Sequence, residues 1–134
     1  MSFAVWVQWF EDGRPATIPI AVVERVFSAS VTRRDDSRWQ LRHGDRDLCE
    51  LHLQFREPQE VVALTVSHPC DAPPLWNSIL EVLRERHGVC YWPGGAVVAS
   101  QEASAQLPED MRMSLGDLDV LASGANIAEA VAHS

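Results

Sequence analysis

The segment 67–71 contains the residue types that nucleophilic catalysis by a thiol requires. Cys70 stands two residues after His68, immediately before the start of an expected helix. The dipole at a helix N-terminus favours a thiolate, and a neighbouring imidazole can act as its base. However, the carboxylate of Asp71 would oppose the thiolate, and we find no third group that would orient the imidazole. We therefore favour a strand-to-helix loop with a small buried thiol, and we expect no catalytic residues.

Two residues of metal-binding types, Cys49 and His52, are separated by two positions. A strand with this spacing points the two side chains to opposite faces of its sheet. A structural zinc site needs four ligands, and the sequence contains no second pair with a matching spacing. His43, His68 and Cys70 could converge only through the fold. We therefore expect no metal site.

The adjacent glycines Gly94 and Gly95 do not form a phosphate-binding loop. Such a loop continues with Lys and then Ser or Thr, and this sequence contains no Lys. A dinucleotide fingerprint needs a third glycine at the start of a helix. We interpret the two glycines as a tight turn that joins two strands, and we expect no cofactor.

Negative charge is concentrated near the end of the chain. The 134 residues include 19 acidic and 11 basic side chains, which give a net charge of −8. Residues 101–134 hold 6 of the acidic and one of the basic side chains, and so account for −5. Most acidic segments are simply solvated, but an acidic surface also steers a protein toward a basic partner. We predict a protein interface here, with an exposed aromatic anchor. The predicted contact residues are Trp92, Glu109, Asp110, Asp117 and Asp119.

Period-2 alternation of apolar residues predicts the strands that position these groups. The expected strands are 3–10, 38–43, 48–55, 61–66, 89–92 and 118–121, with 96–99 as a continuation of the fifth. The first of them is apolar on both faces, which is typical of an internal strand. The polar segment 28–37 is expected to be an exposed loop.

Apolar residues at helical spacing predict a helix after Asp71, which we expect to be its N-cap. Pro73 and Pro74 would lie in its first turn, and Gly88 would end it. Shorter helices are expected from Pro19, Ser100, Pro108 and Ala125. Together these patterns predict a single α+β domain, residues 1–134, with a mainly antiparallel sheet of about five strands and two or three helices packed on it.

One interface between the sheet and the helices is expected to form the core. Its predicted members are Val5, Val7, Leu51, Leu53, Leu64, Ile79, Leu80 and Leu83. Trp9, Trp39 and Trp76 also fall on apolar faces, whereas the pattern leaves Trp6 and Trp92 undetermined.

Composition excludes several classes of protein. The acidic balance argues against a nucleic-acid binder, which needs a surplus of cations. No apolar run approaches the ~20 residues that a membrane span requires. The N-terminus lacks the basic region of a signal peptide. The three cysteines are an odd number without close spacing, which is unusual for a secreted disulfide scaffold. We expect a cytoplasmic protein with reduced thiols.

The size, the acidity and the mixed α+β pattern resemble those of the small immunity proteins of bacterial toxin systems. The chain is also similar to uncharacterised small bacterial proteins over residues 65–115. That pattern consists of Pro69-Cys70-Asp71, Leu75-Trp76, Tyr91-Trp92-Pro93-Gly94-Gly95 and Leu107-Pro108-Glu109-Asp110-Met111. The first resemblance implies a non-enzymatic protein that binds a cognate toxin and covers its active site, without assigning a role to any residue.

Three classes of function follow from these observations. The leading one is a binding or inhibitory protein whose partner is another protein, such as a toxin with a basic surface. The second is a small structural or scaffolding subunit that associates through exposed aromatic residues. The third is a thiol-dependent enzyme that uses Cys70 and His68.

Overall fold

A computed structural model describes residues 4–43, 47–70, 72–98, 100–115, 119–120 and 124–132 of the chain. These residues form ten strands and five helices. The strands are β1 (Ala4–Glu11), β2 (Arg14–Ala16), β3 (Ile18–Pro19), β4 (Val31–Arg34), β5 (Arg38–His43), β6 (Asp47–Glu57), β7 (Glu60–Ser67), β8 (Gly88–Trp92), β9 (Gly95–Val98) and β10 (Asp119–Val120). The helices are α1 (Ile20–Phe27), α2 (Pro73–Arg84), α3 (Gln101–Gln106), α4 (Glu109–Leu115) and α5 (Gly124–Ala132). Within these ranges, no helix is both long enough and apolar enough to cross a bilayer.

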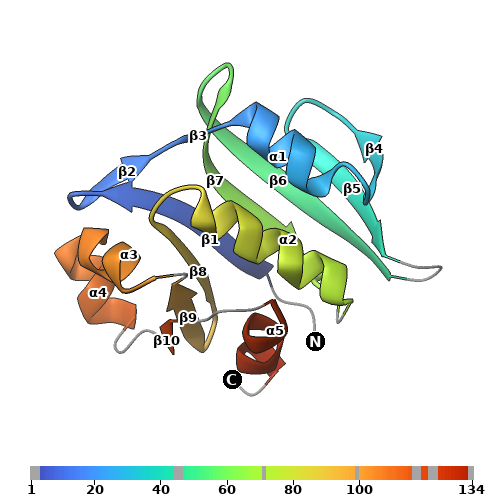
Figure 1. Cartoon of the computed structure of the whole chain (residues 1–134). Helices are drawn as coiled ribbons and strands as arrows, with labels where there is room; N and C mark the ends of the chain where they lie inside the picture. The colour runs from blue at the N-terminus through green and yellow to red at the C-terminus, as the bar shows by residue number, and fades with distance from the viewer. Residues whose placement is uncertain are drawn as a thin grey trace.

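One sheet contains all ten strands (Figure 1). Its order is β10-β9-β8-β1-β7-β6-β5-β4, with β2 paired to β1 and β3 paired to β7. The described pairs are antiparallel except for β10 and β9, which run parallel. The α+β class and the mainly antiparallel sheet are therefore confirmed. So is the internal position of β1, which lies between β7 and β8.

The expected count of about five strands and two or three helices is too low. β2 and β3 have three and two residues, which is too short for a period of two to be visible. β4 lies inside the segment 28–37, which we expected to be a loop. Its last three residues, Thr32, Arg33 and Arg34, are all exposed at the edge of the sheet, so the sequence there does not alternate.

One face of the sheet is covered by α1 and α2, which lie in front of the strands in Figure 1. The side chains on this face form the larger of two hydrophobic clusters. All eight predicted core residues belong to it, namely Val5, Val7, Leu51, Leu53, Leu64, Ile79, Leu80 and Leu83. Trp9, Trp39 and Trp76 are buried in the same cluster, as predicted.

The longest helix, α2, is the predicted one, but its two ends differ from the expectation. It begins at Pro73 after Ala72 as N-cap, with no side-chain capping bond, and Asp71 lies outside the described residues. The helix ends at Arg84, and Gly88 instead begins β8. A Cβ atom at Gly88 would lie 2.8 Å from the Cα atom of Leu83. The glycine therefore permits close approach of two backbones and does not cap the helix.

The second face of the sheet is covered at one end only in the described chain. Here α3 and α4 pack on β8 and β9 over a smaller cluster, with members Phe10, Val89, Ala96, Val98, Ala103 and Leu107. Ser100 caps α3 as expected, since its hydroxyl accepts a hydrogen bond of 3.1 Å from the backbone N–H of Ala103. The helix pair thus forms a separate layer on this side of the sheet.

Candidate functional site

Beyond α3 and α4, the second face of the sheet carries polar and aromatic side chains. We call the described side chains that point to this side from β1, β4, β5, β6, β7 and β8 the open face. The strand registers place on it Trp6, Gln8, Arg33, Arg38, Gln40, Arg42, Leu48, Glu50, His52, Thr65 and Tyr91. Because alternate residues point inward to the core, the two faces of the same strands differ sharply in polarity.

One row of the open face runs straight across five strands. The register pairs Arg38 with His52, and His52 with Thr65. It then pairs Thr65 with Trp6, and Trp6 with Tyr91. Cβ atoms of directly opposed residues lie about 4.5–5.5 Å apart. The row therefore brings together a cation, an imidazole, a hydroxyl and two aromatic rings.

The aromatic end of this row is fixed by its own contacts. The rings of Trp6 and Tyr91 are stacked, with centroids 5.7 Å apart. The phenol of Tyr91 donates a hydrogen bond of 2.7 Å to the Oε1 atom of Gln8. Burial raises the pKa of Tyr91, and the neighbouring Cys90 adds to that rise. Both rings are half-buried, and the stacking and the hydrogen bond orient them at this end of the row.

The polar end of the row is built around Glu50. The Nε2 atom of His52 lies 3.1 Å from Oε2 of Glu50. The Nε atom of Arg38 lies 3.9 Å from the same oxygen, so one carboxylate is shared by two side chains. Arg33, on β4, has no ion-pair partner among the described residues. Arg33 and Arg38 line one hollow at this end together with the carboxylates of Asp35 and Glu50, so charges of both signs meet there.

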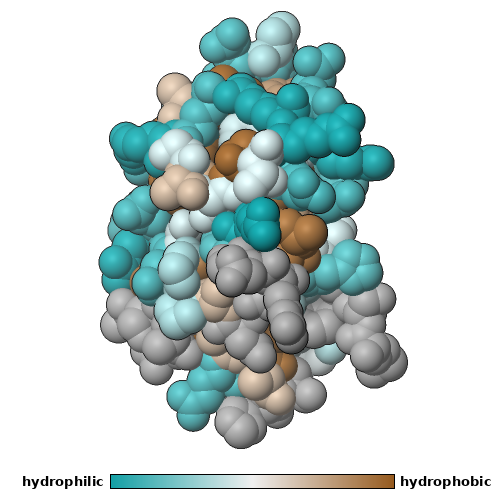
Figure 2. Space-filling model, turned by 90° about the vertical axis from the view of Figure 1, so that its right-hand side faces the viewer, coloured by the Kyte–Doolittle hydropathy of each residue, from teal (hydrophilic) through white to brown (hydrophobic). Residues whose placement is uncertain are grey.

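Figure 2 looks at the molecule from the side on which β4 and β5 lie. Hydrophilic residues cover most of the described part of that side, with small hydrophobic areas between them. This agrees with the exposed positions of Thr32, Arg33 and Arg34 on the edge strand.

A second surface with functional residues lies on α4. Met111 and Leu115 pack against the smaller cluster and mark the inner side of this helix. Met113 lies on the outer side and is 78% exposed. Glu109 and Asp110 are also exposed, and they stand four and three residues before Met113. One helical turn therefore places both carboxylates beside an exposed apolar side chain.

The β1–β2 turn adds another carboxylate to this region. The backbone N–H of Asp12 donates a hydrogen bond of 2.7 Å to Oε1 of Gln106, at the end of α3. The N–H of Gly13 donates one of 2.8 Å to the carbonyl oxygen of Gln106. These bonds fix Asp12 at the junction of α3 and α4. We call Asp12, Glu109, Asp110 and Met113 the acidic surface.

The prediction that Trp92 is an exposed anchor is wrong. Its side chain is buried, with 6% exposure, and belongs to the main core on the helix side of the sheet. A Cβ atom at Gly95 would lie 2.8 Å from the indole, so the ring packs closely on the Gly95 backbone. Trp92 and Gly95 pair across β8 and β9, which gives them the same face. Met113, not Trp92, is the apolar side chain beside the acidic residues.

Of the four predicted acidic contact residues, the structure places Glu109 and Asp110 together on α4. Asp117 lies outside the described residues. Asp119 pairs with Val97 through the backbone of β10, but its side chain is outside the described part of the chain.

Cys70 and His68 have different surroundings in the structure. His68 is exposed and has a φ of 54°, in the left-handed region. Cys70 is half-buried and packs against the main core. No hydrogen bond joins the two side chains in the described part of the chain. The backbone carbonyl of Cys70 accepts one of 2.9 Å from Nε1 of Trp76, so this residue connects the loop to α2.

Cys49 and His52 point to opposite faces of β6, as the spacing predicts. Cys49 is buried in the main core, whereas His52 lies on the open face. Over the residues that the structure describes, no group of three or more His, Cys, Asp or Glu side chains is arranged to hold a metal ion.

A hollow of about 660 Å³ lies between α1, the β4–β5 turn and the β6–β7 hairpin. Its lining includes the apolar side chains Ile20 and Phe55 together with charges of both signs. Arg34, at its edge, is 2.7 Å from Glu24 and lies 4.4 Å over the ring of Trp39. Its charge is therefore already compensated within the fold.

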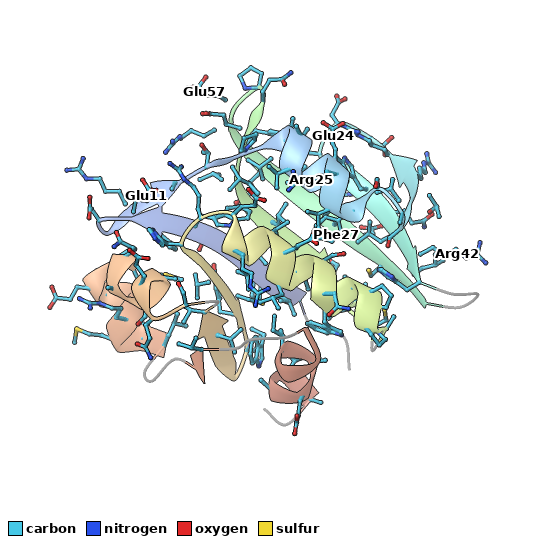
Figure 3. The ribbon with its side chains drawn as sticks, viewed as in Figure 1. Glu11, Glu24, Arg25, Phe27, Arg42 and Glu57 are labelled. Atoms are coloured by element: carbon cyan, nitrogen blue, oxygen red, sulfur yellow. The ribbon has the colours of Figure 1, made fainter. Side chains whose placement is uncertain are left out.

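Figure 3 labels two charged side chains at opposite ends of the sheet. Glu11, next to Asp12, is labelled on the hairpin beside α3 and α4, and Arg42 is labelled at the opposite end of the sheet.

The sequence analysis did not identify Met113, Asp12 or the arginines of the open face as candidate site residues. The spacing of Met111 and Leu115 could have revealed Met113, because residues four apart share a helix face and leave Met113 on the other.

Comparisons with protein-family models, with curated proteins and with solved structures found no match.

Proposed function

We propose that the protein is a non-enzymatic inhibitory protein that binds a basic partner protein through its acidic surface. The observation that carries this proposal is the exposed side chain of Met113, which lies one helical turn after the exposed carboxylates of Glu109 and Asp110. Methionine is enriched in protein interfaces, where its flexible side chain fits an uneven partner surface. The carboxylates around it would steer a basic partner and fix its orientation.

The partner that fits this surface best is a cognate toxin, as for an immunity protein. An inhibitor of this kind acts by covering an active site, which needs a surface and no chemistry of its own. The three free cysteines, Cys49, Cys70 and Cys90, support a place in the reducing cytoplasm.

The test compares three immobilised proteins in an extract of the native host. They are the wild type, an acidic-surface variant with Glu109→Gln and Asp110→Asn, and a control with Glu57→Gln and Glu60→Gln. The control carries the same charge change on exposed residues of the β6–β7 hairpin. We expect the wild type and the control to retain one basic protein that the acidic-surface variant does not retain.

A growth assay then tests inhibition itself. Co-expression with the retained protein should restore growth for the wild type and the control, and not for the acidic-surface variant. Equal retention on all three proteins, or retention without any inhibition of the partner, would refute the proposal.

A further inference from the structure

The two methionines of α4 lie in different surroundings. Met111 is half-buried and packs against the smaller hydrophobic cluster. Met113, on the outer side of the helix, is 78% exposed and belongs to neither hydrophobic cluster. The helix therefore holds one thioether against the fold and presents the other to solvent.

Met113 is also the most exposed sulfur-containing residue in the described part of the chain. Cys49 and Cys90 are buried, and Cys70 is half-buried. Burial raises the pKa of the Cys90 thiol and so suppresses the thiolate that an oxidant attacks. An oxidant in solution therefore has freer access to the thioether of Met113 than to the sulfur of either buried cysteine.

Oxidation of this thioether changes the property that suits it to an interface. Hydrogen peroxide transfers one oxygen atom to the sulfur: the O–O bond breaks, an S–O bond forms, and the two electrons that the sulfur gives up reduce the peroxide to water. The product, methionine sulfoxide, is polar where the thioether is apolar and flexible. A polar group must lose its water when an interface covers it, so the sulfoxide binds a partner less well.

The oxidation is also reversible. Two thiols reduce the sulfoxide to the thioether, are themselves oxidised to a disulfide, and release the oxygen atom as water. Methionine sulfoxide reductases catalyse this step, with one enzyme for each epimer of the sulfoxide.

We propose that Met113 is a site of reversible oxidation by peroxides, and that the sulfoxide releases the basic partner from the acidic surface. This inference rests on the proposed function, because it assigns a regulation to the same surface. Glu109 and Asp110 keep their charges when Met113 is oxidised, so they still steer the partner. The oxidised protein should therefore lose the partner through faster dissociation.

The fold tolerates this change at Met113 better than at Met111. The outer side chain has no place in a hydrophobic cluster, so its sulfoxide leaves the packing of α4 intact. A sulfoxide at Met111 would instead set a polar group against the smaller cluster. Loss of binding with an unchanged fold therefore separates regulation through Met113 from general oxidative damage.

The oxidation site is measured on the purified protein alone. After graded exposure to hydrogen peroxide, trypsin cleaves at Arg112 and places Met111 in residues 87–112 and Met113 in residues 113–134. Fragment mass spectra then assign the added oxygen to each methionine. We expect Met113 to be oxidised about threefold or more faster than Met111, because susceptibility follows exposure. Equal rates at the two methionines of the folded protein would overturn the proposal.

The effect on binding is measured with immobilised protein that is oxidised before it meets an extract of the native host. The wild type is compared with Met113→Leu, with Met113→Gln as a polar mimic, and with Met111→Leu as the control. Dithiothreitol after the peroxide restores reversibly oxidised thiols and leaves sulfoxides in place. One sample of oxidised wild type then receives the two reductases, and circular dichroism checks the fold of each protein.

We expect oxidised wild type and oxidised Met111→Leu to retain about tenfold less of the basic protein than before treatment, since an apolar interface side chain has become polar. The reductases should restore retention, Met113→Gln should show the loss without peroxide, and Met113→Leu should not respond to peroxide. Unchanged retention by oxidised wild type, or an equal loss in Met113→Leu, would overturn the proposal. A wild type that retains no basic protein before treatment refutes the proposed function and this regulation with it, whereas the peptide rates still decide the oxidation site.

Discussion

Cys70 is connected to the fold through its backbone and not through its thiol. Its carbonyl oxygen holds the indole of Trp76, while the side chain only packs against the edge of the core. Cys90, in contrast, is fully buried within β8, and burial raises the pKa of its thiol. The two cysteines therefore differ in what a small polar substitution would disturb.

We predict that Cys70→Ser leaves partner binding and host protection intact and changes stability by less than about 1 kcal/mol. The carbonyl of residue 70 still accepts the Trp76 bond in this variant. Cys90→Ser is the matched comparison. It should lower the free energy of unfolding by about 1–3 kcal/mol, because it buries a hydroxyl at a position that is shaped for a thiol. Thermal unfolding measures both. If Cys70→Ser abolished host protection without changing the melting curve, the result would support a thiol-dependent enzyme that uses Cys70 and His68.

Tyr91 is the only tyrosine of the chain, so its ionisation can be followed by absorbance. Its raised pKa means that the folded state favours the neutral phenol. The corresponding stabilisation is complete below the unfolded pKa of about 10 and is lost as the pH rises through the higher folded value. We predict that tyrosinate forms at higher pH in the native protein than in urea. Coincident titrations would show that the phenol is not desolvated on the open face.

At the scale of the element, the close approach of β8 to the end of α2 depends on Gly88. A methyl group there would meet both the Cα and the carbonyl oxygen of Leu83 at 2.8 Å, and backbone atoms cannot rotate away. We predict that Gly88→Ala destabilises the protein by about 1–3 kcal/mol, as overpacking usually does. Denaturant unfolding measures this, and an unchanged midpoint would mean that β8 can shift without cost.

The packing of α2 on the sheet is tested by a matched pair of leucines. Leu80 is buried at 5% exposure on the inner side of α2, whereas Leu48 is 51% exposed on the open face. We predict that Leu80→Ala costs about 2–5 kcal/mol, since it removes buried contacts and leaves a cavity. Leu48→Ala should change stability by less than about 0.5 kcal/mol. Similar losses for the two variants would show that the assigned faces are wrong.

The elements that the sequence predicts well are those with a complete hydrophobic period. β1, β6, β7 and α2 each bury one side against the core, so their apolar residues repeat at the spacing of the element. β2 and β3 are too short to repeat, and β4 buries almost nothing. Their existence depends on hydrogen bonds to distant strands, which the sequence does not display.

The candidate site was predicted only where it depends on a single helix. Glu109 and Asp110 are neighbours in sequence and lie together on α4. The prediction of Trp92 as an exposed anchor was wrong because the pairing of Trp92 with Gly95 in the β8–β9 hairpin determines which face of the sheet the indole takes. Asp12 joins the acidic surface through a contact with Gln106, which is 94 residues away. Contacts of that range follow from the fold and from no local pattern.

At the scale of the whole molecule, the acidic surface lies on the layer of α3 and α4, over the β8–β9 end of the sheet. The net charge of −8 has the sign that association with a basic partner requires. Charges near an interface act mainly on the rate of encounter, while buried apolar contacts set the lifetime of the complex. The acidic surface should therefore control association, and Met113 should control dissociation.

The central claim is that the acidic surface captures a basic partner, and the association rate tests it most directly. With the partner immobilised, we would measure the rate for the wild type and for a four-residue variant that neutralises Glu109 and Asp110 of the acidic surface together with the predicted contact residues Asp117 and Asp119. The control, with Asp36→Asn, Glu57→Gln, Glu60→Gln and Glu81→Gln, carries the same change of charge on other exposed residues. Salt screens surface charges to a reach of about 8 Å at physiological ionic strength. We predict that the wild-type rate falls as salt rises, and that the four-residue variant associates more slowly at low salt with little change in its dissociation rate. A four-residue variant that associates at the wild-type rate in low salt would contradict the claim.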